Sequence, residues 1–202
     1  MQGQTDTKPQ TVSGQAKRRE HITKNEKNKM TTTVNFLIRL ILTGLLVAWA
    51  VMPYFDNSTN DSVLNEIFRI GILPSFLIIG AFFIMVGFYC RTLQKCLTLI
   101  KPENRKTKPT SVWYMFAIPF NFVEDFFIVI NVANSIEKEK SSNIKLKNVS
   151  DFGIISGIGW SIAQVLSFIP NIVGQIAGLL GMILVIYHWT QIAKINKLLA
   201  DN

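Results

Sequence analysis

The chain is poor in the residues on which most catalytic and metal sites depend. It has two cysteines and two histidines in 202 residues. His21 lies in a polar segment and His188 lies near the end of an apolar run, so a haem held by two histidines in one apolar region is excluded within this chain. No HExxH, GxGxxG or GxxxxGK[ST] motif occurs, and no Ser/His/Asp set can be assembled. We therefore expect no enzymatic activity, no cofactor and no bound metal.

The two cysteines predict neither a disulfide nor a metal site. Cys90 and Cys96 stand at the basic end of the second apolar run. That end is expected in the reducing cytoplasm, where disulfides are rare. We interpret both residues as small apolar side chains at a helix end.

Lysine and arginine are missing from one region of an otherwise basic chain. The formal net charge is +8, yet residues 53–66 contain no Lys or Arg and three acids. Clustered Lys and Arg mark the cytoplasmic side of a membrane protein, so residues 53–66 are expected outside and both termini inside. This sorting accounts for the charge without nucleic-acid binding. The basic residues gather in 8–29, 91–108, 138–147 and 194–197.

Long apolar runs are what the chain does have. Residues 36–52, 70–90, 152–169 and 172–189 each approach or reach the length that crosses a bilayer core about 30 Å thick. They lack the alternation of barrel strands. The expected fold is an all-α integral membrane protein with four transmembrane helices, in two helical hairpins, plus one amphipathic re-entrant or interfacial segment. The predicted spans are about 35–52, 69–90, 152–169 and 172–190.

Two regions flank or make up this predicted fold. Residues 1–33 are polar and basic, which predicts a disordered cytoplasmic tail whose Lys17, Arg18 and Arg19 contact anionic lipid or serve as an orientation signal. Residues 34–199 are expected to form the membrane helix bundle. The polar stretch before residue 36 is too long for a signal peptide, so the first span is expected to be retained.

The segment 111–137 is apolar but carries charge at its centre. On a helix, one stripe is formed by Asn121, Glu124, Asp125, Ile128, Asn131, Ser135 and Lys138, and aromatic and aliphatic residues crowd the other side. Such a helix lies at an interface or lines a bundle. Glu124 and Asp125 are either the solvated polar face of an interfacial helix or a candidate ion or proton site.

Two topologies follow from this segment. In the first, 111–134 spans the membrane and 152–190 is a single long helix. In the second, 111–137 enters and returns on the cytoplasmic side, and 152–169 and 172–189 form a hairpin that turns at Pro170 and Asn171. The second is favoured because it leaves every basic residue outside the spans on the cytoplasmic side.

Small residues recur at four-residue spacing in this last hairpin. Such spacing lets membrane helices approach closely, so we expect a packing seam between the arms, with self-dimerisation as the alternative. The motifs are Gly153-x-x-x-Gly157, Gly174-x-x-x-Gly178 and Ala177-x-x-x-Gly181.

Three segments within residues 85–199 carry a resemblance. They are Trp113 followed by Ile118-Pro119-Phe120-Asn121-Phe122, the turn Phe168-Ile169-Pro170, and the ending 187–194 (YHWTQIAK). The chain resembles an uncharacterised family of small bacterial multi-pass inner-membrane proteins with a WxxxxIPxFN-like segment. The resemblance implies a bacterial inner membrane and no catalytic residues.

Two functional hypotheses follow. The first is a non-enzymatic inner-membrane accessory or scaffold subunit, whose partners are the lipid bilayer and other membrane proteins or a second copy of the chain. The alternative is a small transporter or channel component that uses Glu124 and Asp125. Fold class alone does not choose between them.

Overall fold

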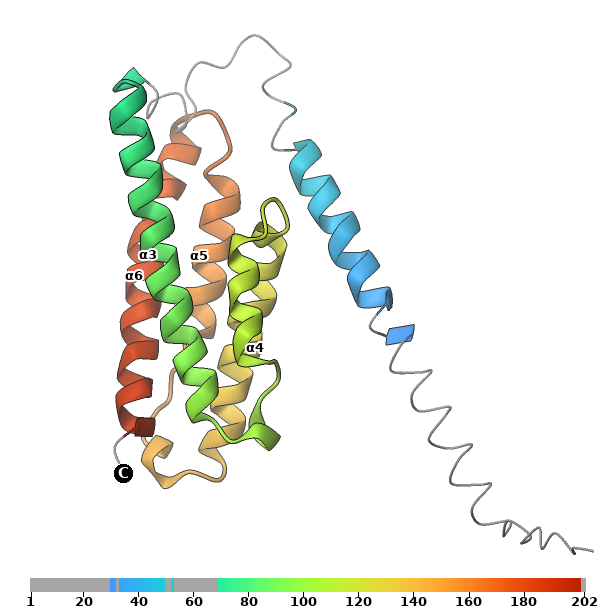
Figure 1. The fold of residues 1–202 in the computed structure, drawn as a ribbon, viewed down its shortest axis with the longest axis vertical. Coiled ribbons are helices and arrows are strands. Elements are labelled where there is room, and N and C mark those ends of the chain that lie inside the picture. Colours follow the sequence, from blue (N-terminus) through green and yellow to red (C-terminus); the bar gives the residue numbers. More distant parts are fainter. Residues whose placement is uncertain (1–29, 32, 50–51, 53–68, 201–202) are drawn as a thin grey trace, which may run out of the picture. The chain divides into compact units, whose positions relative to one another are not determined.

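The structure is a computed structural model that describes residues 30–31, 33–49, 52 and 69–200. Within these ranges all regular structure is helical and no strand occurs, which confirms the predicted all-α class. Thr33–Trp49 forms an apolar helix. Residues 69–200 form a helix bundle (Figure 1), which is treated by itself because the chain divides into two units at Ile41 and Leu42. Residues 1–29 and 32 of the predicted tail, and residues 53–66, lie outside the described ranges, whereas residues 30, 31 and 33 are helical, contrary to the predicted disorder.

Two helices of the bundle are long and apolar enough to cross a membrane. They are α3, Ile72–Leu99, and α6, Ile172–Ala200. At about 1.5 Å per residue each is about 42 Å long, which exceeds a hydrocarbon core of about 30 Å. Both helices continue well beyond the predicted spans, because polar residues near their C-terminal ends still favour the helix although they do not raise hydropathy.

Local hydrogen bonds define where these helices begin. α3 follows Gly71, whose φ of 112° lies in a region that favours glycine. The Ser75 hydroxyl donates to the Gly71 carbonyl at 2.6 Å. α6 follows Asn171, whose side-chain oxygen accepts from the backbone N–H groups of Val173 at 2.9 Å and Gly174 at 3.3 Å. Asn171 thus caps α6 and stops the preceding chain from continuing as one helix.

The prediction of four spans is met only in part. α5, Ile154–Leu166, has 13 residues and is about 20 Å long. Thr33–Trp49 is also among the shorter apolar helices. α5 is shorter than predicted because Gly153, in the left-handed conformation with φ 80°, precedes its first turn and the 167–171 turn follows its last. The alternative of one helix over 152–190 is wrong, because α5 and α6 are separate arms of a hairpin.

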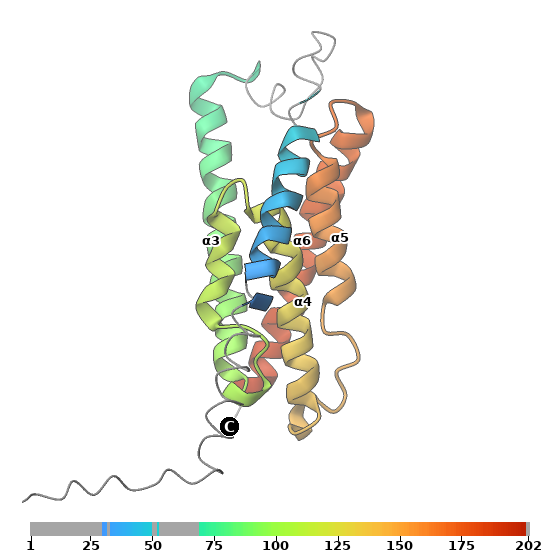
Figure 2. The same cartoon turned by 90° about the vertical axis from the view of Figure 1, so that its right-hand side faces the viewer.

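The predicted segment 111–137 forms both arms of a helical hairpin. Its first arm is η2, Pro109–Phe116, and its second is α4, Asn121–Lys140. The backbone N–H of Lys106 donates to the Ser135 hydroxyl at 2.9 Å, so the chain enters and leaves this hairpin at the same end of the bundle. Figure 2 shows the hairpin stopping well short of the N-terminal end of α3.

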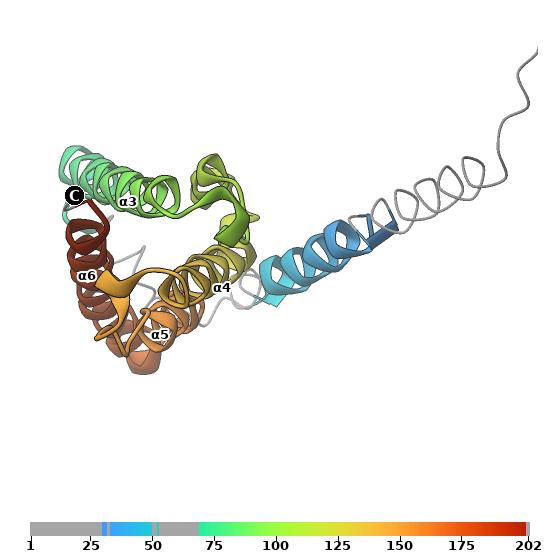
Figure 3. The same ribbon diagram turned by 90° about the horizontal axis from the view of Figure 1, so that it is seen from below.

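The bundle is a closed ring of packed elements. Viewed along its axis, α3, α6, α5 and α4 follow one another, and η2 closes the ring between α4 and α3 (Figure 3). Two short 3₁₀ turns, η1 (Pro102–Asn104) and η3 (Ile144–Leu146), lie in the connections. The fully buried apolar side chains include Leu93, Leu97, Ile136, Leu146 and Ile192. The core therefore lies toward the C-terminal ends of α3, α4 and α6.

Candidate functional site in the bundle interior

A buried tyrosine–histidine pair joins the two long helices. The Tyr89 hydroxyl lies 2.7 Å from Nδ1 of His188, and both side chains are almost completely buried. The Trp160 ring meets the Tyr89 ring edge-on with centroids 5.5 Å apart. Trp189, next to His188, donates from its indole N–H to the Thr92 hydroxyl at 2.8 Å. These contacts fix the rotation of α3 against α6 and hold the aromatic cluster in one arrangement.

Two glycines make room for His188. A Cβ atom at Gly153 would lie 2.7 Å from Cδ2 of His188, and one at Gly157 would lie 2.1 Å from Cγ1 of Val129 and 3.1 Å from Nε2 of His188. Gly157 therefore brings the backbone of α5 close to α4 and α6 together. The prediction placed Gly157 in a packing seam between α5 and α6 alone. In the structure its nearest neighbour is Val129 of α4, and His188 of α6 lies further away.

The other predicted packing glycines occupy different settings. A Cβ at Gly174 would lie 1.9 Å from the Ile169 carbonyl oxygen, so this glycine closes the turn before α6. At Gly181 it would make ordinary contact with Ala163 of α5 at 3.4 Å. Gly178 is partly exposed on α6. The structure thus brings Gly181 to the α5–α6 contact and uses Gly174 for the turn.

Part of the polar stripe of α4 faces inward, although Lys138 at its end is exposed. Asn121, Asp125 and Ser135 are buried, whereas Phe122, Phe126 and Phe127 on the aromatic side are only partly buried. Of the two orientations open for this helix, lining the bundle is the one observed. The expectation that Glu124 and Asp125 share a solvated face is wrong for Asp125, whose side chain is 1% exposed.

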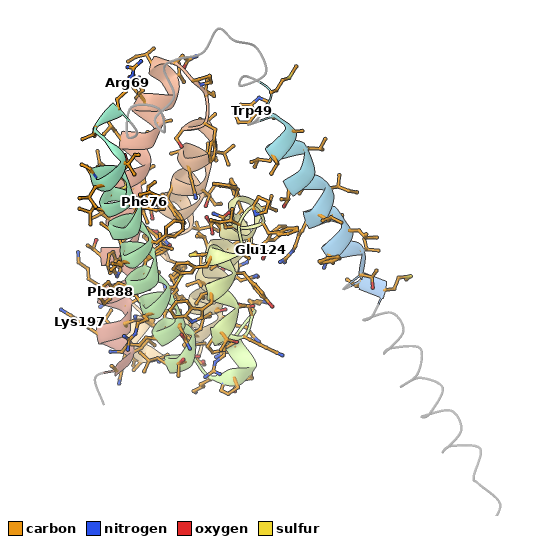
Figure 4. The ribbon with its side chains drawn as sticks, turned by 45° about the horizontal axis from the view of Figure 1, so that its top comes forward. Trp49, Arg69, Phe76, Phe88, Glu124 and Lys197 are labelled. Atoms are coloured by element: carbon orange, nitrogen blue, oxygen red, sulfur yellow. The ribbon has the colours of Figure 1, made fainter. Side chains whose placement is uncertain are left out.

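Glu124 and Asp125 have different surroundings. Successive helical residues point about 100° apart, so only one of the pair can face the interior. Glu124 is partly exposed on α4 (Figure 4). The structure brings Asp125 together with Gln164 of α5, whose side chain hydrogen-bonds to it. Sequence reasoning missed Gln164, although a lone glutamine in an apolar run was the available signal.

Several oxygen atoms at this contact lack a hydrogen-bond donor. Oδ1 of Asp125, Oδ1 of Asn121 and Oε1 of Gln164 are all buried without a partner. Asn121 is 8% exposed and lies one helical turn before Asp125. Buried polar atoms are rarely left without partners in folded proteins, so this contact is the most unusual polar feature of the described bundle.

Glu139 is a second buried carboxylate, and both of its oxygen atoms accept hydrogen bonds, unlike Oδ1 of Asp125. Oε2 of Glu139 accepts from the Asn104 side chain at 2.7 Å and from the Lys101 backbone N–H at 3.1 Å. Burial raises the pKa of Glu139, but the hydrogen bonds from Asn104 and Lys101 lower it further, so its pKa lies below the ordinary value near 4.5. Glu139 thus ties the end of α4 to the loop after α3 as a structural group.

The described residues offer no obvious metal centre. No group of three or more His, Cys, Asp or Glu side chains that could hold a metal comes together in residues 30–31, 33–49, 52 and 69–200. Cys90 and Cys96 are free and buried. The predicted lipid-contacting residues Lys17, Arg18 and Arg19 lie outside the described part of the chain.

Comparison of this chain with family models, with curated proteins and with solved structures found no match in any of the three.

Proposed function

We propose that this chain is an integral protein of a bacterial inner membrane and works there as a non-enzymatic accessory or scaffold subunit. In this proposal α3 and α6 cross the bilayer, the hairpin of η2 and α4 enters from the cytoplasmic side, and both termini are cytoplasmic. The resemblance carried by residues 113–122 and 187–194 supports the bacterial inner membrane.

The observation that carries the proposal is the outward-facing apolar surface of α3 and α6. In the most apolar 18-residue stretch of each helix, only 17% of α3 and 28% of α6 are buried within the bundle. Helices at the core of a soluble protein are instead mostly covered by protein. Figure 4 shows Phe76 and Phe88 projecting from α3, where both are exposed. An apolar surface of this extent fits lipid tails or another membrane protein.

Charge at the two ends of the bundle supports the orientation. The C-terminal halves of α3, α4 and α6, together with the loops that follow α3 and α4, carry most of the lysines and arginines of residues 69–200. The opposite end, formed by 69–72 and 167–171, carries only Arg69. This asymmetry supports a cytoplasmic location for the basic end.

The buried side chains support a scaffold more than an enzyme. Several buried polar side chains join different elements, as Tyr89 binds His188 and Glu139 binds Asn104. Such pairs hold helices in register. The exposed apolar surface then remains available for lipid and for another membrane protein.

Single cysteines test the membrane arrangement. Lys106→Cys and Lys145→Cys should be protected from an impermeant thiol reagent in intact cells, and Asn171→Cys should be labelled. The native thiols of Cys90 and Cys96 are completely buried, so the unmodified chain is a suitable background control. Labelling of Lys145→Cys in intact cells would contradict the re-entrant hairpin.

Purification in mild detergent tests the scaffold role. We expect a membrane protein to co-purify at a fixed ratio, and to be lost when an exposed apolar residue of α6 such as Leu179 is replaced by serine. The matched control is Thr190→Ser, at the basic end of the same helix. A chain that purifies alone under all these conditions would contradict the scaffold role.

A transporter or channel component remains the second candidate, and the burial of Asp125 favours it. An ionisable side chain among apolar helices is costly and usually has a function. Proteoliposomes containing the purified chain should then show a cation flux that Asp125→Asn abolishes. Without such a flux, the scaffold proposal stands.

A further inference from the structure

We propose that Asn121, Asp125 and Gln164 form a binding site for one monovalent alkali cation. The site lies where the first turns of α4 pack against α5. It goes beyond the scaffold role, because it concerns a ligand inside the bundle rather than a partner outside it.

The donor atoms come from two helices that the fold brings together. Asn121 and Asp125 are four residues apart on α4, a spacing that places side chains on one face about 5–6 Å apart. Gln164 belongs to α5 and hydrogen-bonds to Asp125. The residues that connect η2 to α4 place Asn121 at the first position of the helix, and this connection contains Pro119.

All three unpartnered atoms are acceptors. Oδ1 of Asn121 and Oε1 of Gln164 offer lone pairs and no proton, and Oδ1 of Asp125 does so when its carboxyl is ionised. Within residues 69–200 the other buried side-chain oxygen without a donor is Oδ1 of Asn196, which stands alone, whereas Oε2 of Glu139 accepts from Asn104. Carboxylate and amide oxygens are the ligands that hard cations prefer. A cation satisfies all three atoms at once, and water completes its coordination.

The charge of the site selects a monovalent ion. Asp125 supplies one negative charge when it is ionised, and no group of three or more acidic, histidine or cysteine side chains comes together among the described residues. Calcium and magnesium sites usually gather more carboxylates. One carboxylate and one monovalent cation form a neutral pair, which limits the cost of burying either charge.

The test measures thermal stability of the full-length protein in detergent. Choline chloride is replaced stepwise by sodium chloride or potassium chloride at constant ionic strength and pH. A ligand that binds only the folded state at about ten times its Kd should raise the unfolding midpoint of a chain this size by about 3–6 °C. We expect a saturable rise with sodium or potassium, and comparison of the two salts identifies the preferred ion.

Two variants separate the site from general charge effects. Asp125→Asn should remove the rise, whereas Glu124→Gln, the neighbouring carboxylate outside the site, should keep it. A midpoint that does not respond to either salt would overturn the proposal, as would equal responses in wild type and Asp125→Asn. A midpoint that depends on pH but on neither cation would mean that the carboxyl binds a proton, which would also overturn it.

A direct measurement covers the case in which Asp125→Asn does not fold. Radioactive sodium should bind the wild-type protein with about one ion per chain and be displaced by unlabelled sodium or potassium chloride but not by choline chloride. Absence of displaceable binding would overturn the proposal. Because this readout needs no partner protein, its result is independent of the scaffold role.

Discussion

The two halves of α3 are parts of one helix in two environments. Residues 72–85 are almost wholly apolar, and Ser75 is their only buried side chain. Residues 86–99 carry Arg91 and Lys95, yet they bury six side chains against η2, α4 and α6. Hydropathy alone would assign the first half to a core and the second to a surface. In the proposed membrane arrangement, the exposed apolar residues of the first half face lipid, which is itself apolar.

The largest difference should appear when a leucine is shortened in each half. Leu93→Ala removes a completely buried side chain and should cost about 2–5 kcal/mol of stability. Leu73 is 72% exposed, so Leu73→Ala should change stability by about 0.5 kcal/mol or less. Thermal unfolding in detergent measures both. Equal losses would mean that the two halves are packed alike.

A charge placed in the first half should oppose membrane insertion, whereas one in the second half should leave it unchanged. Phe76 is 65% exposed, and Phe76→Lys should oppose insertion by about 2.5–3.5 kcal/mol if its surroundings are lipid. In a water-soluble protein the same exposed substitution would be nearly neutral. The fraction of chain recovered in membranes after carbonate extraction measures the effect. Thr98→Lys, exposed in the second half, is the control and should insert normally.

The hydrogen bond at the boundary between the halves should have a smaller effect. Tyr89→Phe leaves Nδ1 of His188 without the hydroxyl at 2.7 Å and should cost about 1–3 kcal/mol. Thermal unfolding is again the measurement, with Tyr114→Phe on the exposed surface of η2 as the control. An unchanged midpoint for Tyr89→Phe would show that the pair does not couple α3 to α6.

The smallest effect is expected at Glu139 of α4, whose carboxylate binds the loop that follows the second half of α3. Glu139→Gln keeps an acceptor for Asn104 and Lys101 but loses the charge, which should cost about 0.5–1.5 kcal/mol near neutral pH. Because the pKa of Glu139 is lower in the folded protein, its contribution is fully present above the unfolded value near 4.5 and is lost as pH falls through the folded value. The difference in midpoint between wild type and Glu139→Gln should therefore shrink below about pH 4.5. A difference that grows in acid would contradict this account.

Local sequence patterns determined much of the fold. The apolar runs predicted α3 and α6, because length and hydropathy are properties of consecutive residues. Pro170 and Asn171 predicted the turn between α5 and α6, since an asparagine cap acts within three residues of itself. The span lengths were less accurate, because helix ends are set by capping and packing rather than by hydropathy.

Only the tertiary structure decided which way each helix faces. The polar stripe of α4 was visible in the sequence, but its periodicity is the same whether it meets water or the bundle interior. Tyr89 and His188 are 99 residues apart, and no local pattern links them. Gln164 reaches Asp125 only because Gly157 lets α5 approach α4 at Val129. The sequence by itself determined the helices and their order, whereas their rotations, and with them the interior oxygen atoms, depend on contacts between segments far apart in the chain.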